Sequence, residues 1–183
     1  MTRSTDVFVP VNDRPRIAND ANADAFVSIH CNAATNRDAQ GTETWAFSAT
    51  SQGAVLANAM HPAMIRRLGR RDRGVRFQGF AVLQLTRMPA CLLELAFISN
   101  AEEERLLANA GFQQLAATAI NEGLQAWRAP PLRPAPLPPG DDLAPAPPMP
   151  LPPGDDLAPA LPMDVVGRLE SVASRLEALL ERL

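Results

Sequence analysis

Lysine is absent from this sequence of 183 residues, and all 17 basic side chains are arginines. The complete absence of one basic residue type reflects coding composition rather than selection for guanidinium chemistry, so clusters of arginine carry little weight. We therefore expect the arginines between positions 66 and 76 to form the exposed end of a helix, and we expect no nucleic-acid partner. These residues are Arg66, Arg67, Arg70, Arg71, Arg73 and Arg76.

Cysteine is also scarce. Cys31 and Cys91 are too few for a disulfide framework and form no CxxC metal pair, so we expect both to be small core residues. No apolar run approaches the roughly 20 residues of a membrane span. The amino terminus lacks the basic and hydrophobic regions of a secretory signal. The sequence as given thus predicts a soluble chain with neither a membrane span nor a signal peptide.

Composition divides the chain into three parts. Residues 1–128 are apolar enough for a core and are nearly neutral, with 13 Arg against 12 Asp and Glu. Residues 129–163 are rich in proline and contain a tandem repeat, which predicts a semi-rigid extended linker. Residues 164–183 carry apolar residues at alternating spacings of four and three, which predicts an amphipathic helix that pairs with a copy of itself or another chain, or folds back on the domain.

Within residues 1–128, helical and strand patterns alternate, which predicts an α/β domain. Asn12 or Asp13 is expected to cap a first helix and Ser51 to open a second, in which Pro62 forces a kink or a break. Ser99 and Glu102 resemble a capping box, and the acidic residues 102–104 suit the positive end of a helix dipole. Strands are expected at 25–29, 41–47, 80–85 and 90–98, and a last helix is expected over 112–127.

Glu94 stands out because it lies within the otherwise apolar run 90–98. An ionised carboxylate in a low dielectric costs several kcal/mol unless cations or donors compensate it. Glu94 is therefore expected to be paired, neutral or facing a site. Upstream, the apolar strand pattern 25–29 ends in His30, so two strand ends carry chemically useful groups. From the residues alone, a structural role for both is the more frequent outcome.

The order and spacing of several segments carry a family resemblance. Residues 23–32 read ADAFVSIHCN and residues 93–100 read LELAFISN, and between them lie GTETW at 41–45, RGV at 73–75 and MPA at 88–90. Over residues 2–127 the sequence closely resembles the zinc-dependent N-acetylmuramoyl-L-alanine amidases of the amidase-3 type.

This resemblance implies a fold, a reaction and two site residues. The fold would be a mixed, mostly parallel sheet flanked by helices, similar to the zinc exopeptidases. The reaction would be hydrolysis of the peptidoglycan amide that joins N-acetylmuramic acid to L-alanine, in the periplasm or outside the cell. The residue matching His30 is a Zn²⁺ ligand in this family, and the one matching Glu94 is the catalytic acid/base. A metal with one open position activates water, which suits these assignments.

The sequence departs from the family at its start. The resemblance implies a preceding strand and helix that carry the other two zinc ligands, and this first βα unit is expected to be missing, which leaves the chain as given inactive alone. Three residues are candidate replacement ligands. His61 is expected at a surface or helix end, Cys31 should point away from the face of His30, and Glu43 either approaches the cleft or pairs with an arginine.

Two other functions stay open. In a cysteine hydrolase, Cys31 or Cys91 would be activated by His30 or His61. In a non-catalytic wall-binding or adaptor protein, the linker and the helix at 164–183 would recruit partners.

Overall fold

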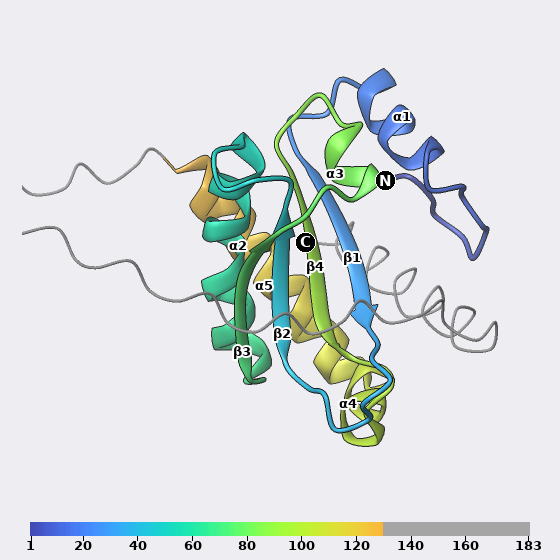
Figure 1. The fold of residues 1–183 in the computed structure, drawn as a ribbon, viewed down its shortest axis with the longest axis vertical. Coiled ribbons are helices and arrows are strands. Elements are labelled where there is room, and N and C mark those ends of the chain that lie inside the picture. The colour runs from blue at the N-terminus through green and yellow to red at the C-terminus, as the bar shows by residue number, and fades with distance from the viewer. Residues whose placement is uncertain (130–183) are drawn as a thin grey trace, which may run out of the picture.

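A mixed sheet of four strands forms the centre of residues 1–129, the part of the chain that the computed structural model describes. The strands are β1 (Phe26–Asn32), β2 (Thr42–Ala46), β3 (Asp72–Phe77) and β4 (Ala90–Phe97), and their order in the sheet is β1-β4-β2-β3. The pairs β1–β4 and β2–β3 are parallel, while β2–β4 is antiparallel. The predicted mixed, mostly parallel α/β fold is confirmed (Figure 1).

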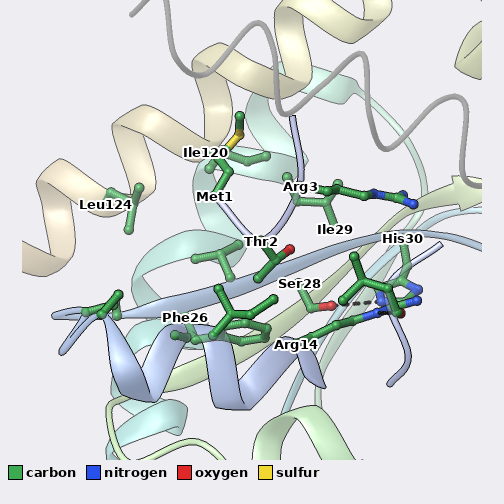
Figure 2. A pocket seen from close by; sticks show the side chains of 17 residues that line it. Met1, Thr2, Arg3, Arg14, Phe26, Ser28, Ile29, His30, Ile120 and Leu124 are labelled. Carbon is green, nitrogen blue, oxygen red and sulfur yellow. Dashed lines mark hydrogen bonds between the residues drawn. The ribbon is translucent and has the colours of Figure 1, made fainter. Parts of the chain in front are cut away.

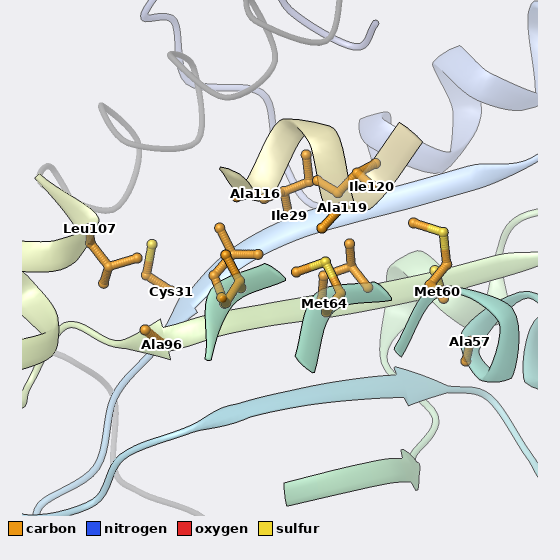
Figure 3. Packing of buried hydrophobic residues seen from close by; sticks show 14 of the residues in the cluster. Ile29, Cys31, Ala57, Met60, Met64, Ala96, Leu107, Ala116, Ala119 and Ile120 are labelled. Carbon is orange, nitrogen blue, oxygen red and sulfur yellow. The ribbon is translucent and has the colours of Figure 1, made fainter. Parts of the chain in front are cut away.

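Helices cover the two faces of the sheet unequally. The long helices α2 (Gln52–Leu68) and α5 (Ala110–Arg128) pack against one face and form the main core with β1 and β4 (Figure 3). A smaller apolar cluster on the other face contains residues of α1 (Asp13–Asp20) and α3 (Ala81–Gln84), the latter a single turn. This second face is therefore covered near α1 and α3, where side chains such as Phe26, Leu92 and Val82 pack together.

The first two helices begin at the cap positions that the sequence predicts. Ser51 caps α2 as predicted, because its hydroxyl accepts a hydrogen bond from the backbone N–H of Ala54. Asn12 occupies the cap position of α1, although its side chain makes no capping hydrogen bond. Of the two outcomes predicted at Pro62, a kink or a break, the break is wrong, because α2 continues to Leu68.

The acidic turn after β4 also differs from the expectation. Helix α4 (Ala101–Leu107) is capped by Asn100, which accepts from the N–H groups of Glu102 and Glu103, rather than by Ser99. Glu103 is fully buried and accepts hydrogen bonds from the backbone N–H groups of Gly41 and Phe97. It ties the start of β2 to the end of β4, so it does more than complement the helix dipole.

The prediction of a strand at 80–85 is wrong, because this segment contains α3. The fourth strand of the sheet is instead β3. Short apolar runs do not distinguish helix from strand, and Val82 and Leu83 are buried side by side as in a helix. Strand β3 was missed because it is a polar edge strand that begins at Asp72 and carries Arg73 and Arg76. The expectation that the whole arginine cluster forms an exposed helix end is therefore wrong. Arg66 and Arg67 end α2, Arg73 and Arg76 belong to β3, and the two arginines at 70 and 71 lie in the connection.

The predicted last helix is confirmed as α5, in which Phe112, Ala116, Ala119 and Ile120 are buried. None of the helices in residues 1–129 is long and apolar enough to cross a bilayer. The linker predicted at 129–163, apart from its first residue, and the helix predicted at 164–183 lie outside the described residues.

Candidate functional site

The sheet places His30 beside Glu94. In the parallel pairing of β1 and β4 these residues are direct partners, and Glu94 is also the direct partner of Glu43 on β2. Side chains of directly paired residues project from the same face of a sheet. His30, Glu94 and Glu43 therefore form one polar row across three adjacent strands.

This row lies on the face opposite α2 and α5. Alternation along β1 puts Ile29 and Cys31 into the core beneath those helices, so that Ser28 and His30 point to the other side. The same alternation along β4 buries Leu93 and Leu95 in the core and presents Leu92 and Glu94 on the second face. The row lies next to the apolar cluster formed with α1 and α3, two residues further along strands β4 and β2.

Glu94 has the features of a poised acid/base. Its Oε2 atom is buried and has no hydrogen-bond partner among the described residues. Burial raises the pKa of this carboxyl well above its ordinary value, and the negative charge of Glu43 raises it further. A carboxyl with a raised pKa can hold a proton near neutral pH and release it to a reacting group.

Glu43, in contrast, is saturated with donors. Its Oε1 accepts from Asn32 Nδ2 at 2.6 Å and from Trp45 Nε1 at 3.1 Å. Its Oε2 accepts from Arg73 Nε at 2.8 Å and lies 3.5 Å from Arg76 Nε. Of the two alternatives left open for Glu43, the pairing with arginine is confirmed. Sequence reasoning missed Arg73 and Arg76 as site residues because it discounted the arginine cluster as a whole.

His30 is held as a neutral imidazole. Its Nε2 lies 2.8 Å from the hydroxyl of Ser28, and both residues line a cavity of about 350 Å³ (Figure 2). Desolvation, and then the positive charges of Arg14 and Arg3, lower the pKa of His30 to about 4. The neutral form is the one that binds a metal ion, so this environment is compatible with a ligand role.

The other candidate ligands do not join this row. Cys31 is buried in the core cluster, as its strand position predicts. His61 is not at a surface or helix end, and that prediction is wrong: it is 6% exposed, with Nδ1 at 3.0 Å from Thr44 Oγ1 and Nε2 at 2.8 Å from Asp72 Oδ1. It lies within α2, which packs against the opposite face of the sheet.

Both thiols are unsuited to nucleophilic catalysis. Cys31 and Cys91 are buried, and burial raises the pKa of each above its ordinary value, with a further contribution from Glu94 at Cys31. Because the thiolate is the reactive species, this environment disfavours the cysteine-hydrolase alternative.

The described residues do not fit a zinc ion by themselves. Catalytic zinc takes three protein ligands and one exchangeable position. Residues 1–129 contain no cluster of three or more His, Cys, Asp or Glu side chains arranged to hold a metal. His30 and the unpartnered Glu94 thus supply only part of such a site.

The outer edge of β1 is the open side of this site. Among the described strands β1 pairs only with β4, so its other edge has no strand partner there. The cavity runs along that edge, and its lining includes Ile17 of α1 and Ala21, which follows this helix. Figure 2 shows Ile120 and Leu124 of α5 at the cavity, together with the amino-terminal residues 1–3. Its polar end is formed by Ser28, His30 and Arg14, whereas Glu94 is not part of its lining.

Comparison with known proteins agrees with this geometry. The profile of the amidase-3 family, described as N-acetylmuramoyl-L-alanine amidase, matches residues 1–126. The chain is 39% identical over 126 residues to the N-acetylmuramoyl-L-alanine amidase LytC of Bacillus subtilis, covering 67% of this chain and 25% of that protein. It is 38% identical over 130 residues to the endolysin of Bacillus phage SPP1, covering 68% of this chain and 47% of the endolysin.

Solved structures give the same result. The catalytic domain of CwlV, an N-acetylmuramoyl-L-alanine amidase from Bacillus (Paenibacillus) polymyxa, matches with a TM-score of 0.66 and 38% identity over 69% of each chain. An N-acetylmuramoyl-L-alanine amidase from Clostridium difficile matches with a TM-score of 0.66 and 34% identity over 68% of each chain.

The chain spans a quarter to about half of the length of the two curated relatives described above. The family match, in turn, covers more than two thirds of the chain and contains both His30 and Glu94. The chain therefore belongs to the amidase-3 family of N-acetylmuramoyl-L-alanine amidases.

Proposed function

We propose that this chain carries the catalytic carboxylate and one zinc ligand of a peptidoglycan amidase. The reaction is hydrolysis of the amide bond between N-acetylmuramic acid and the L-alanine of the stem peptide, and its place is the periplasm or the cell exterior. The observation that carries the proposal is the buried, unpartnered Oε2 of Glu94 directly across the sheet from a neutral His30.

In this proposal Glu94 moves the proton. Its carboxylate accepts a proton from the attacking water, and the resulting acid donates that proton to the departing amine of L-alanine. The raised pKa supports this role, because a carboxyl in low dielectric is a stronger base than one in water. Full donor saturation of Glu43 leaves it unsuited to the same task.

His30 is proposed as a ligand of Zn²⁺, with the remaining ligands supplied from outside residues 1–129. The open edge of β1 supports this proposal. An added strand would pair with β1, fill the cavity between α1 and α5, and end near His30. We propose that this strand belongs to coding sequence upstream of Met1, and that the chain as given is inactive by itself.

The test compares zinc binding by the chain as given with zinc binding by a form extended by the in-frame upstream sequence. The extended form is expected to bind one zinc ion and to release stem peptides from muropeptides, whereas the given chain should do neither. If the extended form binds no zinc and releases no peptide, the enzymatic proposal fails. Muropeptide binding without turnover in either form would favour the non-catalytic adaptor.

A further inference from the structure

Arg76 lies in a second row of side chains beside the polar row of His30, Glu94 and Glu43. The register pairs Ser28 with Leu92, Leu92 with Trp45, and Trp45 with Arg76. Each of the first three residues is two positions from a member of the polar row, so both rows occupy the same face of the sheet. Arg76 and Glu94 therefore lie on the same face of the sheet, two strands apart.

Contacts with Trp45, Arg73 and Glu43 hold the guanidinium of Arg76 through its planar face and its Nε atom. The group stacks over the ring of Trp45, with 5.6 Å to the ring centroid. Its Nε faces the backbone oxygen of Arg73 at 3.4 Å and Glu43 Oε2 at 3.5 Å. The Trp45 ring is itself fixed, because Nε1 donates to Glu43 and its edge meets Phe80 at a centroid distance of 5.4 Å.

The terminal nitrogens of Arg76 make no hydrogen bond with any residue in the range 1–129, and its side chain is 35% exposed. The charge of Glu43 is already matched by Arg73, which is closer, at 2.8 Å, and only 15% exposed. Arg76 is thus a second cation beside one carboxylate. Its terminal nitrogens form a planar pair of donors on a partly exposed side chain, and this geometry matches an incoming carboxylate.

We propose that Arg76 is a specificity-determining residue that binds a carboxylate in the peptide part of the substrate. This inference rests on the proposed function, in which Glu94 marks the position of the scissile amide. Arg76 and Glu94 are two strands apart and offset by two residues along the strands, which places their backbones about 12 Å apart at the usual strand geometry. An extended peptide advances about 3.3–3.6 Å per residue, so the bound carboxylate belongs to one of the first three residues of the stem.

The test uses the full chain and two matched ligands. One is muramoyl-L-alanyl-D-glutamate with both glutamate carboxylates free, and the other has both converted to carboxamides. Dissociation constants are measured by titration calorimetry for the unmodified protein and for Arg76→Gln, Arg76→Lys and Arg105→Gln. Arg105 is an exposed arginine on α4, so its replacement removes the same charge away from the site.

The unmodified protein is expected to bind the free acid about tenfold more tightly than the amide, as for one charge-assisted contact. Arg76→Gln should bind both ligands equally, Arg76→Lys should keep part of the preference, and Arg105→Gln should keep all of it. Equal binding of both ligands by the unmodified protein, or a preference that survives in Arg76→Gln, overturns this inference while leaving the amidase proposal intact. If the unmodified protein binds neither ligand, this inference also fails, whereas the amidase proposal fails only if the extended form neither binds zinc nor releases stem peptide.

Discussion

Two neighbouring carboxylates on one face of the sheet have opposite surroundings. Glu43 accepts hydrogen bonds from Asn32, Trp45 and Arg73, while Glu94 has one oxygen with no partner in residues 1–129. A protein that buries a carboxylate without donors loses stability, and such a cost is typical of a functional position. This difference in hydrogen bonding is the strongest support, among the individual residues, for a functional role of Glu94.

Replacing Glu94 by glutamine is therefore expected to stabilise the metal-free protein. The gain at pH 8 should be about 1–2 kcal/mol, the usual desolvation cost of one unsatisfied polar group. Because the pKa of Glu94 is raised in the folded state, its ionisation costs stability as the pH rises, so the gain should shrink towards pH 4. Urea unfolding in the presence of a chelator, at both pH values, measures this difference.

The matched variant Glu43→Gln should have the opposite effect. It removes the carboxylate that pairs with the mostly buried guanidinium of Arg73, and breaking a buried ion pair costs about 3–5 kcal/mol. The same unfolding experiment measures it. If Glu94→Gln destabilises the protein as much as Glu43→Gln does, Glu94 is a structural partner.

At the scale of elements, His61 joins α2 to the two strands β2 and β3. Its Nδ1 faces Thr44 and its Nε2 faces Asp72. The hydrogen bond from His61, and then that from the backbone of Gly74, lower the pKa of Asp72 below its ordinary value. Asp72 thus contributes stability above the ordinary aspartate pKa, and this contribution is lost as the pH falls through the lowered one.

Asp72→Asn is accordingly expected to destabilise the protein at pH 7 and to have no effect at pH 2. The loss should be at most about 1 kcal/mol, because the carboxylate is 59% exposed and solvent screens it. Thermal unfolding followed by circular dichroism at several pH values measures it. A loss of equal size at both pH values would show that the carboxylate charge is not the cause.

The crossing of α2 and α5 depends on Gly123. A Cβ atom at this position would lie 2.8 Å from the Cα of Met60, which is backbone and cannot move aside. Gly123→Ala should therefore destabilise the protein by about 1–3 kcal/mol, although alanine favours helix. Gln125→Ala, at an exposed position of the same helix, should be nearly neutral in the same unfolding assay.

Helices and strands with a strong apolar pattern of their own can be predicted from the sequence. A strand that forms only because it pairs with a neighbouring strand cannot. Strand β4 and helix α5 follow from their own apolar patterns, and β1 from its apolar run before His30. Strand β3 is polar and finds its place only through β2, so local pattern gives no sign of it. The pairing of His30 with Glu94 required a family resemblance, because register between distant strands is not encoded locally.

At the scale of the whole molecule, residues 1–129 form a sheet with the main core on one face and the proposed partial catalytic site on the other. The chain belongs to the amidase-3 family, and its sheet pairs His30 with Glu94, the two residues that the family resemblance singles out. The described residues, however, provide too few ligands for zinc. The proposed further strand would pair with the outer edge of β1, beside the cavity that runs along it.

The central claim is that Glu94 performs proton transfer while His30 holds the metal. It is tested most directly by stem-peptide release from muropeptides, with zinc content measured on the same samples of the upstream-extended protein. Glu94→Gln should keep its zinc and lose at least about 100-fold in rate, since general acid–base catalysis contributes 10²–10⁴-fold. His30→Ala should lose both zinc and activity. Undiminished peptide release by Glu94→Gln would contradict the account.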